Sequence, residues 1–412
     1  MARREHTQYN QIDKRKYASA FAGRKEKPAE AGRRSDQARA KRDAAPKRGG
    51  QSPEWKRSAK NASTEAGSTP AAKRGGNRAS GEGRRAGERA QTERAPMAFT
   101  ASGTAAHDWE LPVAVSVETE AQLAEVLKHD AVALVYLDEA CFTDFAAAIR
   151  QLHVAGKQAG LRLRRIERDF DASGRKAENS AELLSALWKA ECDAQSESGA
   201  DRGSAAAAEA APQRPASGKQ SPSCLPDALL VRNLDEAMLL EDFFAAHPEL
   251  GDRIRRNFDY TVYGYNQEAI QALVSLGADG LTYPIELTYH ECRKLKSELP
   301  FELMVYGHLP MMVSANCIQR TSARCDHGNR ILQLRDRMGK DMPVRCYCTY
   351  CYNQIFNAEP LVLYDLPDEV RALQPQCLRY DFSVEPAAVV RQVLDGAVPR
   401  SMTRGHFRHG IE

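Results

Sequence analysis

Residues 111–137 read LPVAVSVETEAQLAEVLKHDAVALVYL, and this stretch indicates the fold class. The apolar run Val113–Val117 has the length and the β-branched side chains of a buried strand. Residues 118–128 then carry apolar side chains at helical spacing, and residues 131–137 form a second apolar run. A strand, an amphipathic helix and another strand in this order predict an α/β fold.

The alternation continues along the chain. Further strands are predicted at 161–166, 228–231, 258–263, 280–284, 302–306 and 378–382, and helices at 142–155, 180–190, 234–246, 267–276, 288–299 and 386–394. The polar stretch 193–224 interrupts the pattern as a surface insertion. Eight strands predict a TIM-like (β/α)8 barrel over residues 108–398, although an open doubly wound sheet has the same alternation. In both folds ligands bind at the carboxyl ends of the strands.

The N-terminal part of the chain has a different composition. Residues 1–100 contain 25 Lys and Arg against 11 Asp and Glu, a charge of +14, whereas residues 101–412 carry 33 − 44 = −11. A segment this poor in Val, Ile and Leu buries too little apolar surface to offset its ordering entropy, so residues 1–107 are predicted to be a disordered basic arm. The arm is either an RNA contact or a solvated linker.

Membrane and export signals are missing from the sequence. Met1 is not followed by the apolar segment of a signal peptide, and 18 consecutive apolar residues do not occur. We therefore expect a cytoplasmic protein without a membrane span. In such a reducing compartment, the ten cysteines are expected to be thiols or metal ligands and not disulfides.

Five of the ten cysteines fall within a cysteine-rich loop predicted at residues 307–357, after the seventh strand: Cys317, Cys325, Cys346, Cys348 and Cys351. The last two form a C-x-x-C turn, which places two thiolates on one ion or cluster. Thiolate donors select Zn²⁺ or an iron–sulfur cluster over hard cations. The uneven spacing favours an iron–sulfur cluster, and zinc is the alternative. The other five cysteines are interpreted as small buried side chains.

The same region resembles a known family. The stretches are ELMVYGHLPMMVSANC at 302–317, LRDRMGK at 334–340, CTYCYN at 348–353 and TRGHF at 403–407. Together they resemble the peptidase U32 family, often called collagenase-like proteases. The resemblance covers residues 110–412 and is most specific at 302–353.

This resemblance implies a barrel and a [4Fe–4S] cluster held by Cys317, Cys325, Cys348 and Cys351. Many relatives have a cysteine where this chain has Pro310, and Cys346 is an alternative ligand. The chain is similar to the C-terminal module of longer, RNA-modifying U32 proteins. The alternatives are a separate chain that supplies the N-terminal module, a split gene and a truncated gene model.

Three functions follow as alternatives. The first is oxygen-independent hydroxylation of an RNA base, which the resemblance implies for part of the family. The second is collagenase-like proteolysis, for which the sequence offers neither a G-x-S-x-G nor an H-E-x-x-H motif. The third is a non-catalytic, cluster-bearing subunit of a larger U32 protein.

Two further residues are candidates for catalysis. Glu286, after the sixth strand, is a possible general base, and helix capping is its alternative role. His308, after the seventh strand, lies beside the cysteine-rich loop, and a structural hydrogen bond is its alternative role. The remaining candidates are Tyr263 and Tyr306 for base stacking, Arg335, Arg337 and Lys340 for phosphate contact, and the basic tail 399–412.

Overall fold

Eight parallel strands close into a barrel in the computed structural model, which describes residues 97–200, 222–322, 325 and 327–409. In order around the barrel these are β2 (Val113–Val117), β3 (Val132–Asp138), β4 (Gln158–Arg162), β5 (Ala228–Val231), β6 (Arg255–Phe258), β7 (Gly280–Thr282), β8 (Phe301–Gly307) and β14 (Cys377–Asp381). The last strand, β14, pairs with both β8 and β2, so no barrel strand is left as an edge. The predicted (β/α)8 barrel is confirmed, and the open sheet is excluded.

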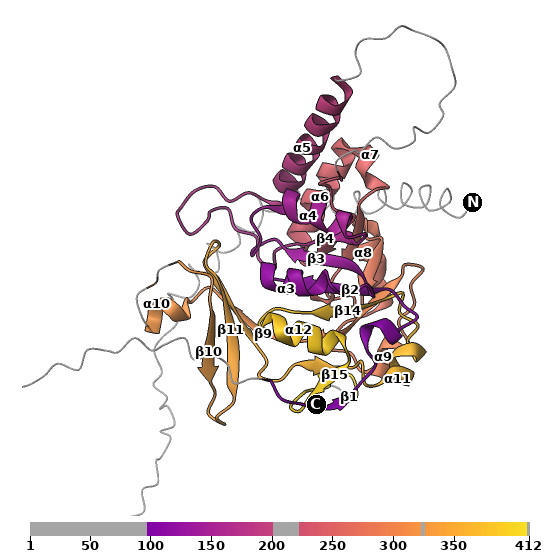
Figure 1. The fold of residues 1–412 in the computed structure, drawn as a ribbon, viewed down its shortest axis with the longest axis vertical. Coiled ribbons are helices and arrows are strands. Elements are labelled where there is room, and N and C mark those ends of the chain that lie inside the picture. Colours follow the sequence, from indigo (N-terminus) through magenta and orange to yellow (C-terminus); the bar gives the residue numbers. More distant parts are fainter. Residues whose placement is uncertain (1–96, 201–221, 323–324, 326, 410–412) are drawn as a thin grey trace, which may run out of the picture. The chain divides into compact units, whose positions relative to one another are not determined.

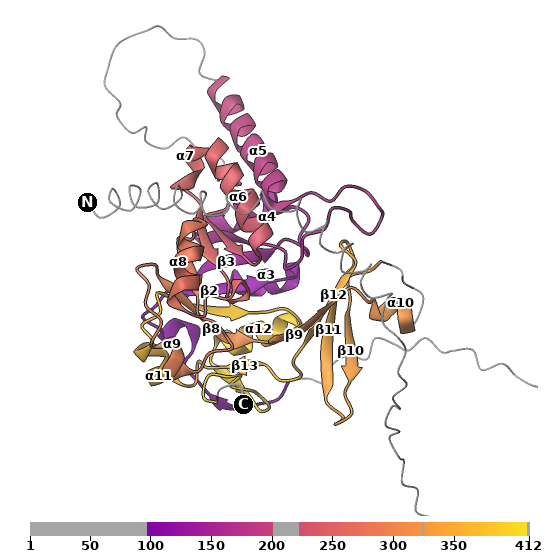
Figure 2. The same cartoon turned by 180° about the vertical axis from the view of Figure 1, so that it is seen from behind.

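Helices surround the strands, as Figures 1 and 2 show. They are α3 (Glu120–Val126), α4 (Phe145–Val154), α5 (Ser180–Ala200), α6 (Leu234–Ala246), α7 (Pro248–Gly251), α8 (Gln267–Ser275), α9 (Tyr289–Cys292), α11 (Pro367–Ala372) and α12 (Ala387–Leu394). The main apolar core lies between these helices and the outward side chains of the strands. None of the helices in the described ranges is both long and apolar enough to cross a bilayer.

Local sequence signals set several helix ends. Asn233 caps α6, because its side-chain oxygen accepts the Glu236 N–H at 2.8 Å. Gly277 follows α8 at φ +88° and Gly396 follows α12 at φ +85°. Both glycines adopt the left-handed conformation that ends a helix.

Several predicted elements differ from the structure. The strand expected at 161–166 is β4, which begins at Gln158 and ends at Arg162. The strand expected at 258–263 ends at Phe258, because the Asp259 carboxylate accepts the Tyr260 N–H and starts a 3₁₀ turn. The helix expected at 288–299 is only α9, Tyr289–Cys292. The N–H groups of Lys294 and Leu295 make the tighter i to i+3 hydrogen bonds of a 3₁₀ turn. The chain then leaves the helical conformation before Pro300.

The segments that flank the barrel also differ from expectation at their boundaries. Residues 97–107, assigned to the basic arm, contain β1 (Phe99–Ser102), which pairs with β15 (Ala397–Pro399). Helix α5 extends to Ala200, into the predicted insertion. The rest of the arm, 1–96, and most of the insertion, 201–221, lie outside the described residues.

The Tyr136 side chain packs inside the barrel against Ala114, Leu134, Ala228 and Leu230. It faces Gly160 across the β3–β4 pair. A Cβ atom added at position 160 would lie 2.4 Å from Cδ1 of the fully buried Tyr136 ring. The barrel therefore needs glycine at this position to accommodate the ring.

We predict that Gly160→Ala lowers the free energy of unfolding by about 2 kcal/mol, because the ring must leave its rotamer or push the strands apart. Urea unfolding followed by circular dichroism measures this change. The control is Gly251→Ala, where an added Cβ atom meets nothing within 4 Å. Equal stability of the two variants would contradict the prediction.

Candidate functional site

A four-stranded antiparallel sheet lies against the carboxyl ends of the barrel strands (Figure 1). The chain forms it between β8 and β14, in the order β10-β11-β12-β9. The elements are β9 (Pro310–Ser314), α10 (Ile318–Ser322), β10 (Ile331–Arg335), β11 (Asp341–Tyr347) and β12 (Tyr352–Phe356), followed by β13 (Leu361–Val362) on the barrel edge. The cysteine-rich segment 307–357 was predicted as a loop with one small hairpin, and it is instead mostly this sheet.

Side chains alternate between the two faces of a strand, and this gives the sheet two distinct sides. In β11, Arg345 and Tyr347 point to one face and Cys346 to the other. Tyr352 lies opposite Tyr347, and their rings stack at 4.8 Å. Asn353 lies opposite Cys346, so these two residues share the second face.

The first face is joined to the barrel through Glu118, which directly follows β2. Arg345 Nε lies 3.1 Å from Glu118 Oε2, and the Tyr347 hydroxyl donates to Oε1 at 2.9 Å. From inside the barrel, Arg162 Nη1 lies 3.2 Å from the same Oε1. Burial raises the pKa of Glu118, while Arg345 and Arg162 favour its charged form. One carboxylate therefore links the sheet to the barrel.

Beneath Glu118 the barrel interior is charged. The Arg379 guanidinium has Nη2 2.7 Å from Asp259 Oδ1 and Nε 2.9 Å from Asp381 Oδ1, and it also bonds Glu302. All four side chains are buried. Burial alone would raise the pKa of Asp381, but the nearby guanidinium charges and the Ser116 hydrogen bond outweigh it, so the pKa is lowered.

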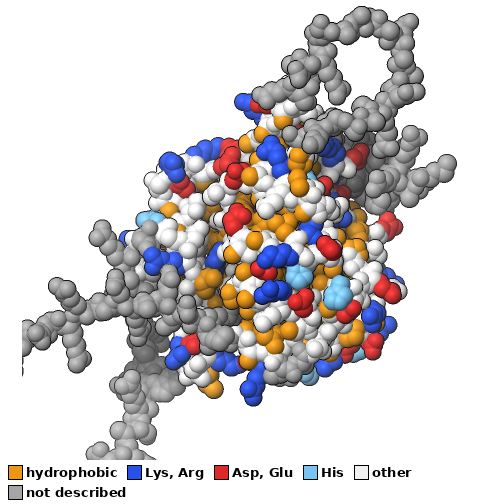
Figure 3. Space-filling model, in the orientation of Figure 1, with side chains coloured by type: hydrophobic (Ala, Val, Ile, Leu, Met, Phe, Trp, Pro, Cys, Tyr) orange, Lys and Arg blue, Asp and Glu red, His pale blue; other side chains and the backbone are white. Residues whose placement is uncertain are grey.

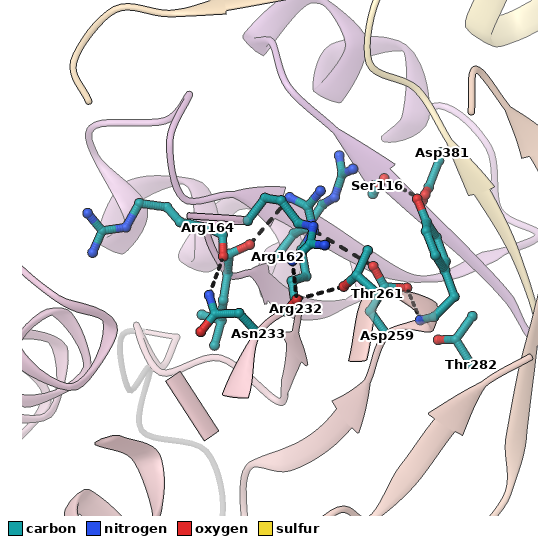
Figure 4. Close-up of polar contacts among 12 residues, drawn as sticks. Ser116, Arg162, Arg164, Arg232, Asn233, Asp259, Thr261, Thr282 and Asp381 are labelled. Carbon is teal, nitrogen blue, oxygen red and sulfur yellow. Dashed lines mark hydrogen bonds and ion pairs between the residues drawn. The ribbon is translucent and has the colours of Figure 1, made fainter. Parts of the chain in front are cut away.

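Two further arginines extend this network toward the strand ends (Figure 4). Arg162 Nη1 and Arg232 Nη1 both lie 3.6 Å from Asp138 Oδ2, and Arg232 Nε lies 3.7 Å from Asp259 Oδ2. The Arg232 carbonyl accepts the Thr261 hydroxyl at 2.7 Å. The sequence analysis missed these charged residues. Their signal was present, because Arg162, Arg379 and Asp381 stand at alternate positions inside otherwise apolar strands.

The second face of the sheet carries cysteines. Burial raises the pKa of Cys346 to about 12, and the charges of Cys348, Cys317 and Cys325 act in the same direction. The thiols of Cys317, Cys325 and Cys348 therefore lie close enough to Cys346 to affect its ionisation. The Asn353 side chain donates to the Asn316 carbonyl at 2.9 Å and so holds the segment that carries Cys317 against the sheet.

Cys351 lies at the end of the C-x-x-C turn. It is exposed and adopts a left-handed φ of +56°. Arg168 donates to the Cys351 carbonyl at 3.5 Å, and the Ala172 N–H donates to the Thr349 carbonyl at 2.7 Å. The turn is thus attached to the loop that follows β4.

The donor chemistry suits a soft metal, because the group contains thiols from four positions. Within the described residues, however, no three Cys, His, Asp or Glu side chains are arranged to hold an ion. The ligand assignment Cys317, Cys325, Cys348 and Cys351, with Cys346 as the alternative, therefore stays a prediction.

The two predicted catalytic residues lie in different surroundings. His308 is buried, with Nδ1 2.7 Å from the Asn357 carbonyl and Nε2 3.7 Å from Glu385 Oε1. Glu286 is exposed on the loop after β7 and accepts the Tyr265 hydroxyl. His308 thus has the surroundings of a structural residue, and Glu286 is open to solvent.

The remaining candidates divide between core and surface. The Tyr306 ring is fully buried against Tyr364 and Phe382 in the core. Tyr263 is about half exposed on the barrel rim. Arg335 is paired with Asp341, and Lys340 with Glu359; in the tail, Arg404 is paired with Asp365, and Phe407 is buried.

Two buried carboxyl groups compete for one hydroxyl next to the rim. The Ser180 oxygen lies 2.9 Å from Glu139 Oε2 and 3.0 Å from Glu236 Oε1. A hydroxyl donates only one proton, so one carboxyl group must be protonated and donate in return. Burial raises the pKa of Glu139 to about 7, although Arg164 opposes the shift, and burial together with the Glu139 charge raises the pKa of Glu236.

We predict that Glu236→Gln makes unfolding less sensitive to pH. The folded-state pKa of Glu236 is raised, so its contribution to stability is complete below the unfolded pKa and is lost as the pH rises. Glutamine cannot ionise, so the slope of unfolding free energy between pH 5 and 8 should weaken by up to about 1.4 kcal/mol per pH unit. Urea titrations at several pH values measure the slope. The control is Glu182→Gln. It removes a more accessible carboxyl group whose pKa is lowered, so it should leave this slope unchanged.

We predict that Arg379→Ala lowers the unfolding free energy by about 3–5 kcal/mol, because it removes the guanidinium group that three buried carboxylates share. The loss should be smaller at pH 5 than at pH 8, since burial raises the pKa of an unpaired carboxyl group and protonation then removes its charge. Chemical unfolding at both pH values tests this. The control Arg335→Ala removes an exposed pair and should change stability little. A variant as stable as the control would show that the network does not need Arg379.

No family model and no curated protein matches the chain. Among solved structures, the chain is similar to a thiamine phosphate pyrophosphorylase from Pyrococcus furiosus, with 9% identity and a TM-score of 0.31 over 69% of this chain and 93% of that one. It is also similar to the C-terminal domain of a protein described as a chitinase from Desulfitobacterium hafniense, with 8% identity and a TM-score of 0.28 over 69% and 99% of the two chains. Similarity this low carries no functional argument.

Proposed function

We propose that the chain is an iron–sulfur protein of the peptidase U32 type that takes part in the oxygen-independent hydroxylation of an RNA base. A hydroxylated organic co-substrate would supply the oxygen atom and would be reduced in return. The observation that carries the proposal is the group of thiols around Cys346, on a sheet whose opposite face contacts the barrel mouth. Thiol donors favour an iron–sulfur cluster or zinc. The resemblance at residues 302–353 favours the cluster.

Cys317, Cys325 and Cys348 would hold the cluster, and Cys351 would be the fourth ligand. The C-x-x-C turn supports Cys351, because it brings its two thiolates to one side of a tight turn. Cys346 is the less suitable ligand because it is 1% exposed and burial disfavours its thiolate. A bound cluster supplies one-electron chemistry and a Lewis-acidic iron.

The protein's own residues would supply a water-poor, polar surface next to this centre. Arg345 and Tyr347 meet Glu118 in a buried arrangement, one strand position away from Cys346. Donors that are already oriented in such surroundings stabilise developing negative charge more strongly than donors in water do. These oriented groups would therefore favour negative charge that develops near the centre.

The charge distribution supports RNA as the partner. Residues 1–100 carry a formal charge of +14, enough for strong, salt-dependent attraction to phosphates. On the described part of the face shown in Figure 3, basic and acidic side chains are mixed. The arm is therefore the part of the chain that would supply sequence-independent affinity. No comparable observation favours proteolysis, since the His308 ring is buried and bonded to Asn357.

We predict about four iron and four sulfide per chain after anaerobic purification, with a visible absorption band that dithionite bleaches. Serine at Cys317, Cys325, Cys348 or Cys351 should remove most of the iron, whereas Cys346→Ser and the control Cys192→Ser should retain it. Iron loss in Cys346→Ser but not in Cys351→Ser would assign the fourth ligand to Cys346. Stoichiometric zinc without sulfide would contradict the cluster.

The reaction has its own test. Mass spectrometry of RNA from a strain without this gene should show the loss of one base heavier by a single oxygen atom. Complementation with the wild-type gene should restore that base, and complementation with Cys348→Ser should not. An unchanged RNA profile, with cluster present in the protein, would favour the non-catalytic subunit. Gelatin cleavage that survives iron chelation would favour the protease.

A further inference from the structure

Two arginines on the barrel rim are not neutralised by the fold. Of the cations on the loop after β4, Arg164 is paired with Glu139, Arg175 with Asp171 and Lys176 with Glu182. Arg165 and Arg168 have no carboxylate partner among the residues that the structure describes. Both are half-buried, so their heads are held near the surface and are not fully hydrated. These two guanidinium groups are therefore available to an external anion.

An exposed aromatic ring lies beside Arg165. Tyr263, which ends the 3₁₀ turn after β6, adopts a left-handed φ of +63° and is 52% exposed. A tyrosine in this conformation is strained, and such strain persists only where the surrounding structure imposes it. The Tyr265 ring meets Tyr263 edge-on at 5.6 Å and is itself bonded to Glu286. The Tyr263 ring is therefore held in position and presented to solvent.

A hydrogen bond joins the ring to Arg165, and Arg168 lies three residues further along the same loop. Arg165 donates to the Arg232 carbonyl at 3.3 Å and to the Tyr263 hydroxyl at 3.4 Å. The same Arg232 carbonyl accepts Thr261, which precedes Tyr263 by two residues (Figure 4). Arg168 donates to the Cys351 carbonyl. The surface thus extends from the end of β6 to the C-x-x-C turn.

We propose that Tyr263, Arg165 and Arg168 form a binding site for single-stranded RNA, in which one unpaired base stacks on Tyr263 and the arginines hold the adjacent phosphates. The proposal rests on the proposed function, because it places the RNA substrate next to the thiol group. An aromatic face combined with free guanidinium groups matches a base and its phosphate backbone. A peptide partner would instead favour a broader apolar surface than one tyrosine ring.

The test uses the full chain, purified anaerobically, and a single-stranded RNA that contains 4-thiouridine. After irradiation, mass spectrometry identifies the cross-linked peptides, so cross-links to residues 1–96 are separated from cross-links to the rim. We expect a cross-link at or next to Tyr263. It should be lost in Tyr263→Ala and retained in Tyr263→Phe, because stacking needs the ring and not the hydroxyl.

Binding in solution gives the second measurement. Tyr263→Ala should weaken RNA affinity about tenfold in fluorescence anisotropy, and Arg165→Ala and Arg168→Ala should each weaken it and reduce its salt dependence. The control is Arg175→Ala, a cation of the same loop that Asp171 already neutralises, and it should bind as the wild type does. Circular dichroism confirms that each variant is folded.

The outcomes distinguish failure of the rim site from absence of the cluster. Cross-links confined to residues 1–96, or equal affinities of Tyr263→Ala and Arg175→Ala, would overturn the rim site even if iron and sulfide are present. A cross-link at Tyr263 in protein without iron would support the rim site and contradict the proposed function. Capture of an unstructured peptide with the same loss in Tyr263→Ala, and no RNA binding there, would assign the surface to a protein partner.

Discussion

The contact between Arg345 and Glu118 determines how the two parts of the molecule fit together. Glu118 ends a barrel strand and is fully buried, so its charge requires cations from more than one side. Arg162 reaches it from the barrel interior and Arg345 from the covering sheet. Without the sheet, this carboxylate would lose one of its two cations and gain contact with water. The position of the cysteine-bearing sheet therefore follows from the need to pair the buried Glu118 with a second cation.

The contact with Glu118 also brings the barrel close to the cysteines. Because β11 alternates, the residues that close the barrel and the residue at the centre of the thiol group are neighbours in one strand. A change of charge on the thiol side would act on the Arg345 side over a short, water-poor distance, where electrostatic interactions are strong. The two faces of the sheet are thus coupled electrostatically, because their residues are adjacent in the chain and lie in surroundings of low dielectric constant.

The sequence predicted the barrel because eight strand-length apolar runs alternate with seven segments of helical spacing. It missed where β6 ends, because a single side chain, Asp259, redirects the backbone at Tyr260. It also treated the cysteine segment as a loop, since β10 is short, and both β10 and β11 are partly polar and exposed at their far ends. For the site, spacing drew attention to the cysteines but not to the ion network. Charges scattered over β4, β8 and β14 become a network only when the barrel closes.

The charged interior also determines where chemistry has room to occur. In most barrels branched apolar side chains fill the space inside the strands, whereas here much of it is filled by guanidinium and carboxylate groups. They are Arg162, Arg232, Arg379, Glu118, Asp138, Asp259, Glu302 and Asp381. A ligand that entered this space would have to separate buried ion pairs, at a cost of several kcal/mol for each uncompensated charge. A reactant is therefore kept out of the barrel interior. The exposed Tyr263 ring, Arg165 and Arg168 lie outside this interior, on the loops that follow β6 and β4.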